Sequence, residues 1–103
     1  MRVIYIPMNQ QPYVIDIPHT LSEMQRLVGG RIEVVEPFAD NVMLVCNEDG
    51  RIEGKPVNRI IMDGMDICGD FFLCGHDGIG LSDFPEDLIE KYTEVFRNNR
   101  IIN

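Results

Sequence analysis

The segment 41–47, Asn-Val-Met-Leu-Val-Cys-Asn, constrains the fold more than any other part of this chain. Every residue between the two asparagines is apolar, whereas a strand with one face in water alternates apolar and polar residues. Successive side chains of a strand point to opposite faces of a sheet. We therefore expect a central strand here, in a sheet that is covered on both sides.

Short segments rich in β-branched and aromatic residues supply the other strands. Residues 7–12 begin and end with proline, which removes backbone donors, so the segments on either side are expected to form a hairpin with a long loop. Glycine and proline interrupt residues 51–69, which we expect to be irregular, with a short helical turn at 58–62. The other predicted strands lie at residues 2–6, 13–17, 31–36 and 71–74.

Two segments have the periodicity and the caps of helices. Thr20 and Glu23 have the spacing of a capping box, and apolar residues then recur at helical spacing as far as Gly29. Glycine readily takes the left-handed conformation that ends a helix. Near the C-terminus, Ser82 or Asp83 is the expected N-cap of a longer helix with an apolar stripe on one side and charges on the other.

These elements predict an α+β fold. We expect a single, mostly antiparallel sheet of about five strands with two helices, a short one after the second strand and a longer one at the C-terminus. A chain of 103 residues fits one domain, so residues 1–103 are expected to form a single α+β domain.

Length and cysteine content predict a cytoplasmic protein. No run of residues approaches the roughly 18 apolar residues of a membrane helix, and the apolar run at the N-terminus is too short for a secretory signal. Three cysteines, an odd number, cannot complete an intramolecular disulfide framework, and reduced thiols are the usual state in the cytoplasm.

The charge of the chain is strongly negative, at −8, with 17 acidic residues against 9 lysines and arginines. Eight acidic residues and no lysine or arginine lie between Ile60 and Glu90. Nucleic-acid binding and anionic membrane surfaces both require basic patches, so we expect neither as a partner. A basic protein partner, a metal ion and simple solubility remain open as explanations of the charge.

Four motifs carry a resemblance to a known family: Leu27-Val28-Gly29-Gly30, Ile32-Glu33-Val34-Val35, Val45-Cys46-Asn47-Glu48-Asp49-Gly50 and Pro56-Val57-Asn58-Arg59. In this order, and with the later Gly69-Asp70-Phe71 and the closing helix, they resemble the family called domain of unknown function 3846 over nearly the whole chain. The resemblance implies a small accessory protein of bacteria, phages or mobile elements, with no established activity. It therefore implies no catalytic residue and no cofactor.

Cys68, Cys74 and His76 are candidate metal ligands, since thiolate and imidazole groups bind zinc. The set lacks the Cys-x2-4-Cys spacing of structural zinc sites, and two half-buried thiols beside a surface histidine are the alternative interpretation. No nucleophile, base and orienting group occur at an informative spacing, so the sequence favours a protein that is not an enzyme.

Asn58 and Arg59 are candidate ligand-binding residues, because arginine can bind a carboxylate or a phosphate through two parallel hydrogen bonds. His76, in the glycine-rich segment 75–80, would complete such a pocket. In the alternative interpretation, Arg59 pairs with Asp63 and Asn58 caps a turn.

Two functions follow as hypotheses. The favoured one is a non-catalytic interaction protein of a phage or mobile element, one version of which is an acidic decoy that presents carboxylates to a DNA-binding protein. Its interaction surface would include Asp83, Asp87 and Glu90, and its binding would weaken as salt rises. The alternative is a small-molecule or nucleotide-binding module, whose ligand would raise the melting temperature in a saturable way.

Overall fold

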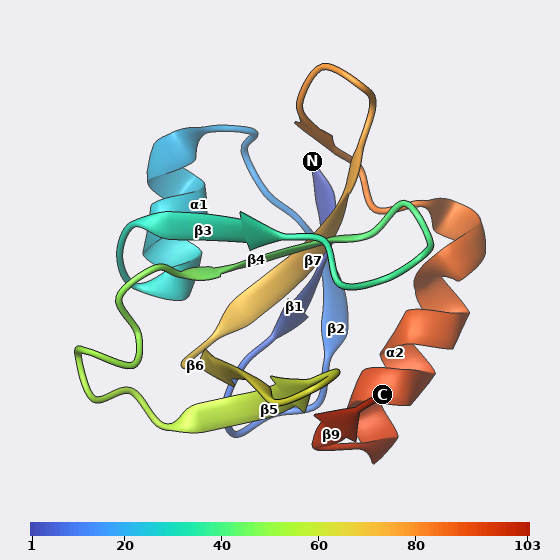
Figure 1. Cartoon of the computed structure of the whole chain (residues 1–103). Coiled ribbons are helices and arrows are strands. Elements are labelled where there is room, and N and C mark those ends of the chain that lie inside the picture. The colour runs from blue at the N-terminus through green and yellow to red at the C-terminus, as the bar shows by residue number, and fades with distance from the viewer.

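Two β-sheets and two α-helices build the molecule (Figure 1). The computed structural model describes all residues, 1–103. The first sheet comprises β1 (Arg2–Ile6), β2 (Tyr13–Asp16), β3 (Ile32–Val35), β4 (Met43–Asn47), β7 (Phe71–His76) and β8 (Leu81–Ser82). The second comprises β5 (Val57–Ile61), β6 (Met65–Cys68) and β9 (Ile101–Ile102). The α-helices are α1 (Leu21–Val28) and α2 (Ile89–Asn98).

The strands of the first sheet follow the order β2-β1-β7-β4-β3, with every neighbouring pair antiparallel, and β8 pairs with β7. In the second sheet β5 lies between β6, which is antiparallel to it, and β9, which is parallel. The predicted α+β class, with a mostly antiparallel sheet of about five strands and two helices, is confirmed. The second sheet is a further element, which the local sequence patterns do not predict.

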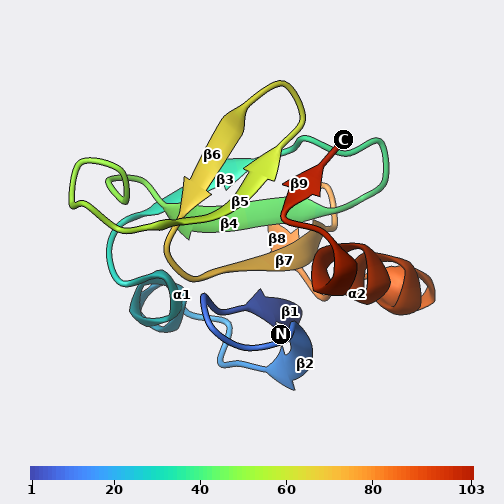
Figure 2. The same ribbon diagram turned by 90° about the horizontal axis from the view of Figure 1, so that it is seen from below.

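Strand β4 is buried along its whole length, as its apolar sequence predicts. Leu44 and Cys46 pack into the core that the first sheet shares with the β5–β6 hairpin and α2. Met43 and Val45 pack into a second core, against α1. Figure 2 shows α1 and the β5–β6 hairpin on opposite sides of β4. The prediction of a sheet covered on both sides is confirmed.

The predicted ends of α1 are confirmed. The hydroxyl oxygen of Thr20 accepts the backbone N–H of Glu23 at 3.2 Å, and Gly29 ends the helix in the left-handed conformation, with φ of 78°. The second bond of the capping box does not form. The carboxylate of Glu23 accepts from Arg26 instead, while the N–H of Thr20 donates to the carbonyl of Pro18.

The predictions for residues 51–69 are wrong, because part of this segment is the β5–β6 hairpin and no helical turn lies at 58–62. The turn of the hairpin places Met62 (φ 51°) and Gly64 (φ 95°) in left-handed conformations. The glycine that suggested a loop therefore makes the hairpin possible. Ile61 and Ile67 are buried against the first sheet, and this packing outweighs the weak local strand signal.

The prediction for the start of the C-terminal helix is also wrong. Neither Ser82 nor Asp83 caps it, because a carboxylate oxygen of Asp83 accepts the backbone N–H of Arg2 at 2.8 Å. A 3-10 turn at Glu86–Leu88 comes first, and α2 follows it.

The apolar stripe predicted for this helix is confirmed, since Phe84, Tyr92 and Phe96 are buried in the core beneath α2. Edge-to-face contacts join Phe84 to Tyr92 and Phe96 to Phe71. Neither α-helix has the length and apolar composition that crossing a bilayer requires.

Candidate functional site

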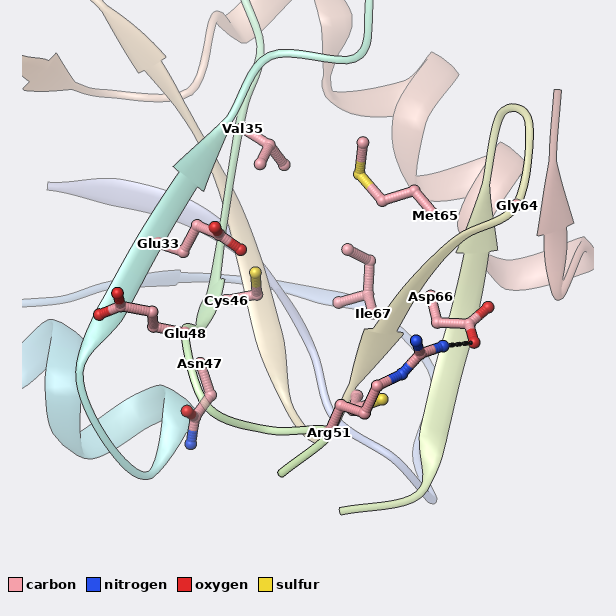
Figure 3. A pocket seen from close by; sticks show the side chains of 11 residues that line it. Glu33, Val35, Cys46, Asn47, Glu48, Arg51, Gly64, Met65, Asp66 and Ile67 are labelled. Carbon is pink, nitrogen blue, oxygen red and sulfur yellow. Dashed lines mark hydrogen bonds and ion pairs between the residues drawn. The ribbon is translucent and has the colours of Figure 1, made fainter. Parts of the chain in front are cut away.

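The larger of two cavities is a cleft of about 330 Å³ between the β3–β4 part of the first sheet and strand β6 (Figure 3). Strand β6 lies over β4, and β3 extends beyond it as the last strand of its sheet. The cleft is therefore shaped like a step, with β3 and β4 as its floor and β6 as its wall.

The floor and the wall present apolar side chains to one another. Val35 and Cys46 lie on the floor, and Met65 and Ile67 line the wall. Met65 is 40% exposed, which is high for a large apolar side chain inside a cleft. Ligand sites commonly combine such an apolar surface with a few polar groups that fix the orientation of the ligand.

Glu33 supplies the free charge of the cleft. It lies directly across from Cys46 in the β3–β4 register, and its carboxylate makes no ion pair. Burial, together with the charge of Glu33 and the neighbouring thiol of Cys68, raises the pKa of the Cys46 thiol to about 11. Cys46 is therefore a protonated, weakly polar part of the floor at neutral pH.

The other charges of the cleft are partly compensated. Arg51 binds Asp66 at 2.5 Å, and a dashed line marks this ion pair in Figure 3. The carboxylate of Glu48 lies 3.6 Å from the guanidinium of Arg31. The lining thus contains three carboxylates and one guanidinium, and its net charge is negative.

Two strand edges beside the cleft are unpaired. Strand β6 pairs only with β5, and β3 pairs only with β4, so each is the edge of its sheet. An edge strand presents a row of free N–H and C=O groups, which can pair with another extended chain. The cleft therefore offers backbone hydrogen bonds as well as side-chain contacts.

Asn47 positions the charged end of the cleft. Its side-chain oxygen accepts the N–H of Asp49 at 2.7 Å, and its nitrogen donates to the carboxylate of Glu53 at 2.9 Å. These bonds fix the turn that carries Glu48 and Arg51. Of the residues that line the cleft, the sequence singles out only Cys68, as a candidate metal ligand, although two of the four family-resembling motifs contain Glu33, Val35, Cys46, Asn47 and Glu48.

Asn58 and Arg59, the predicted ligand-binding pair, lie outside the cleft and bind other parts of the chain. The amide nitrogen of buried Asn58 donates to the carbonyls of Ile6 at 2.9 Å and Gly69 at 3.0 Å. Arg59 donates to the Asn58 side chain and to the carbonyl of Phe96, both at 2.7 Å. Burial, assisted by the charge of Arg100, lowers the pKa of Arg59.

The structure does not bring the candidate metal ligands together. Cys68 lines the cleft, whereas Cys74 packs into the core against α1, where burial raises its pKa to about 12. His76 ends β7, and its ring nitrogen accepts the N–H of Gly78 at 2.9 Å. No group of three histidine, cysteine or acidic side chains lies close enough to hold a metal ion. Asn58 contacts Gly69, which lies just before the first residue of β7, whereas His76 is the last residue of that strand. His76 and Asn58 are therefore far apart.

The predicted interaction surface, Asp83, Asp87 and Glu90, lies around the start of α2, apart from the cleft. The N–H of Arg2 binds Asp83 and holds the pKa of that carboxyl below its usual range. Asp87 and Glu90 are exposed and make no ion pair.

Comparison with known proteins identifies one family. The family model described as Domain of unknown function (DUF3846) matches residues 1–97, which include every residue that lines the cleft. No curated protein and no solved structure is significantly similar to the chain.

Proposed function

The chain belongs to the DUF3846 family, whose description states no activity, and we propose that it is a non-catalytic protein-interaction domain. Its cleft binds an extended, basic segment of a partner protein. The observation that carries this proposal is the unpaired edge of β6 beside a cleft with an apolar floor and the unpaired carboxylate of Glu33.

Strand addition accounts for the shape of the cleft. A segment that pairs with β6 would extend the second sheet by one strand and would lie over the floor made by β3 and β4. Backbone hydrogen bonds supply affinity in this mode of binding, and alternate side chains supply specificity. The bound segment would cover Met65 and Val35, whose apolar surfaces face the cleft.

The charge of the cleft selects a basic segment. Lysine and arginine place an aliphatic stem on apolar surface while the charged end reaches a carboxylate. The cleft offers both, since Val35 lies beside Glu33 on the face of β3 that lines it. The net charge of −8 would also accelerate the encounter with a basic partner and would repel an acidic one.

A binding role also agrees with the chemistry of Cys46, one of the two thiols that line the cleft. With a pKa raised to about 11, Cys46 is almost entirely protonated at neutral pH, and only the thiolate is an effective nucleophile. The lining contains no histidine that could take up its proton.

Titration calorimetry with a basic peptide of alternating lysine and valine tests the proposal. We expect saturable binding that weakens as salt rises, and about fivefold weaker binding by Glu33→Gln, because an ion pair at a partly exposed site is lost. The matched control is Glu90→Gln, which makes the same charge change at the predicted surface near α2. Equal effects of the two substitutions would contradict binding in the cleft and would favour a general effect of net charge.

Backbone pairing is tested separately with peptides that carry one N-methyl group. Methylation removes one N–H, and only every second N–H of an added strand points to β6. We therefore expect binding to be lost when the methyl group is at alternate positions of the peptide, and to change little when it is at the positions between them. Uniform tolerance along the peptide would rule out strand addition.

A further inference from the structure

We infer that the cleft recognises a short sequence pattern in the partner segment, in which a basic residue is followed two positions later by an apolar residue. This inference rests on the proposed function, because it assumes that the partner segment pairs with β6. The inference specifies which side chains of that segment are recognised and in which direction the segment runs.

The cleft is polar at one end and apolar at the other. Glu33 pairs with Cys46 and lies toward the turn that follows β4, whereas Val35 pairs with Leu44 and lies away from that turn. In Figure 3, Glu48 and Arg51 are at the same end as this turn, and Val35 and Met65 are at the opposite end. A bound segment therefore meets charge at one end and apolar surface at the other.

The spacing within the floor matches that of a strand. Glu33 and Val35 are two residues apart in β3, so their side chains point into the cleft from the same face. In an added strand, alternate side chains likewise point to one face, at a separation of about 6.6–6.8 Å. One side chain of the segment can then meet Glu33 while the side chain two positions away lies over Val35.

The direction of β6 sets the order of the two side chains. Met65 begins β6 at the apolar end, and Cys68 ends it beside the turn, where a β-carbon on Gly50 would lie 2.9 Å from the Cys68 carbonyl oxygen. Antiparallel pairing is more common than parallel pairing and slightly more stable. A segment antiparallel to β6 runs from the turn outward and reaches Glu33 before Val35. The basic residue therefore comes first.

The test compares two capped peptides of identical composition, Ser-Thr-Lys-Thr-Val-Thr-Ser and its reverse, Ser-Thr-Val-Thr-Lys-Thr-Ser, by fluorescence anisotropy. We expect the first to bind about fivefold more tightly, and Glu33→Gln to remove most of this difference. Glu90→Gln is the matched control and should preserve it. Since Glu33 is exposed and unpaired, its amide variant should fold normally, which thermal unfolding checks.

The outcomes separate this inference from the proposed function. If both peptides bind equally and both are weakened by Glu33→Gln, the cleft binds basic segments and the inferred order is wrong. If the reversed peptide binds more tightly, the segment runs parallel to β6 and the inference also fails. If neither peptide binds, or if Glu33→Gln and Glu90→Gln have equal effects, the proposed function fails and the inference fails with it.

Discussion

The side-chain amide of Asn58 donates to the backbone carbonyl of Ile6 at 2.9 Å, which ties the second sheet to the end of β1. The same nitrogen donates to Gly69, and the side-chain oxygen accepts from Arg59. Arg59 in turn donates to Phe96 near the end of α2. One buried amide thus connects β5, β1, the turn before β7 and, through Arg59, the C-terminal helix.

Substitution Asn58→Leu should destabilise the fold by about 3 kcal/mol, because two buried carbonyls and a guanidinium donor lose their partner. Urea unfolding followed by circular dichroism measures the loss. Asn98→Ala is the control, since Asn98 is exposed on α2 and should change the free energy of unfolding by less than about 0.5 kcal/mol. A loss at Asn58 no larger than that of the control would show that the amide does not hold the two sheets together.

Gly75→Ala should also destabilise the protein, by about 1–3 kcal/mol or more. A β-carbon at Gly75 would lie 2.4 Å from the backbone oxygen of Asp83, which cannot move away without shifting the chain. At Gly80 nothing lies within 4 Å of the corresponding position, so Gly80→Ala provides the matched control. We expect a melting temperature lowered by several degrees for Gly75→Ala alone. Equal melting temperatures of the two variants would refute the close contact.

Local signals in the sequence predict the parts of the fold that local interactions determine. The cap at Thr20 and the left-handed Gly29 require only neighbouring residues, and both are found where their motifs place them. The uninterrupted apolar run of β4 likewise requires burial on both faces, whatever covers them. The β5–β6 hairpin differs, because packing of Ile61 and Ile67 against the first sheet stabilises it.

The cleft could not be predicted because it too depends on packing between segments that are distant in the sequence. Glu33 and Asp66 come from different sheets, and only the packing of the hairpin over β4 brings their strands to one cavity. Asn58 shows the opposite difficulty, since the residue was predicted to bind a ligand but serves the fold. A polar residue in a segment taken to be irregular suggests a ligand site, whereas a buried amide can equally satisfy backbone carbonyls of its own chain.

Stability should fall at alkaline pH because of two buried thiols. The pKa of Cys46 is raised from 9.0 to about 11, and that of Cys74 to about 12, mainly by burial. Between pH 9 and these values the unfolded chain loses protons that the folded chain keeps, so the free energy of unfolding decreases by about 1.4 kcal/mol per pH unit for each thiol. Well below pH 9 both thiols are protonated in the folded and the unfolded chain, so neither affects the pH dependence of the free energy of unfolding.

Urea unfolding between pH 8 and pH 11 tests this expectation in the native protein and in a Cys46→Ala/Cys74→Ala variant. The variant is expected to be less stable at pH 8, because it loses buried volume, but its stability should depend less on pH. Part of the decrease in stability with rising pH should remain in the variant, since burial and the charge of Asp70 raise the pKa of Tyr5 to about 12. Parallel curves for the two proteins would mean that the thiols are not responsible.

Removal of the one basic side chain that lines the cleft should strengthen binding of a basic segment. Arg51→Gln releases Asp66 from its ion pair and leaves three carboxylates without a guanidinium among the lining residues. We expect about two- to threefold tighter binding of the lysine-containing peptide at low salt, and little change in stability, because exposed ion pairs contribute about 0–1 kcal/mol. Arg26→Gln is the matched control, since it also breaks an exposed arginine–carboxylate pair, on α1 away from the cleft. Titration calorimetry of both variants decides the matter: tighter binding by Arg51→Gln alone supports recognition in the cleft, whereas equal gains would attribute the attraction to net charge.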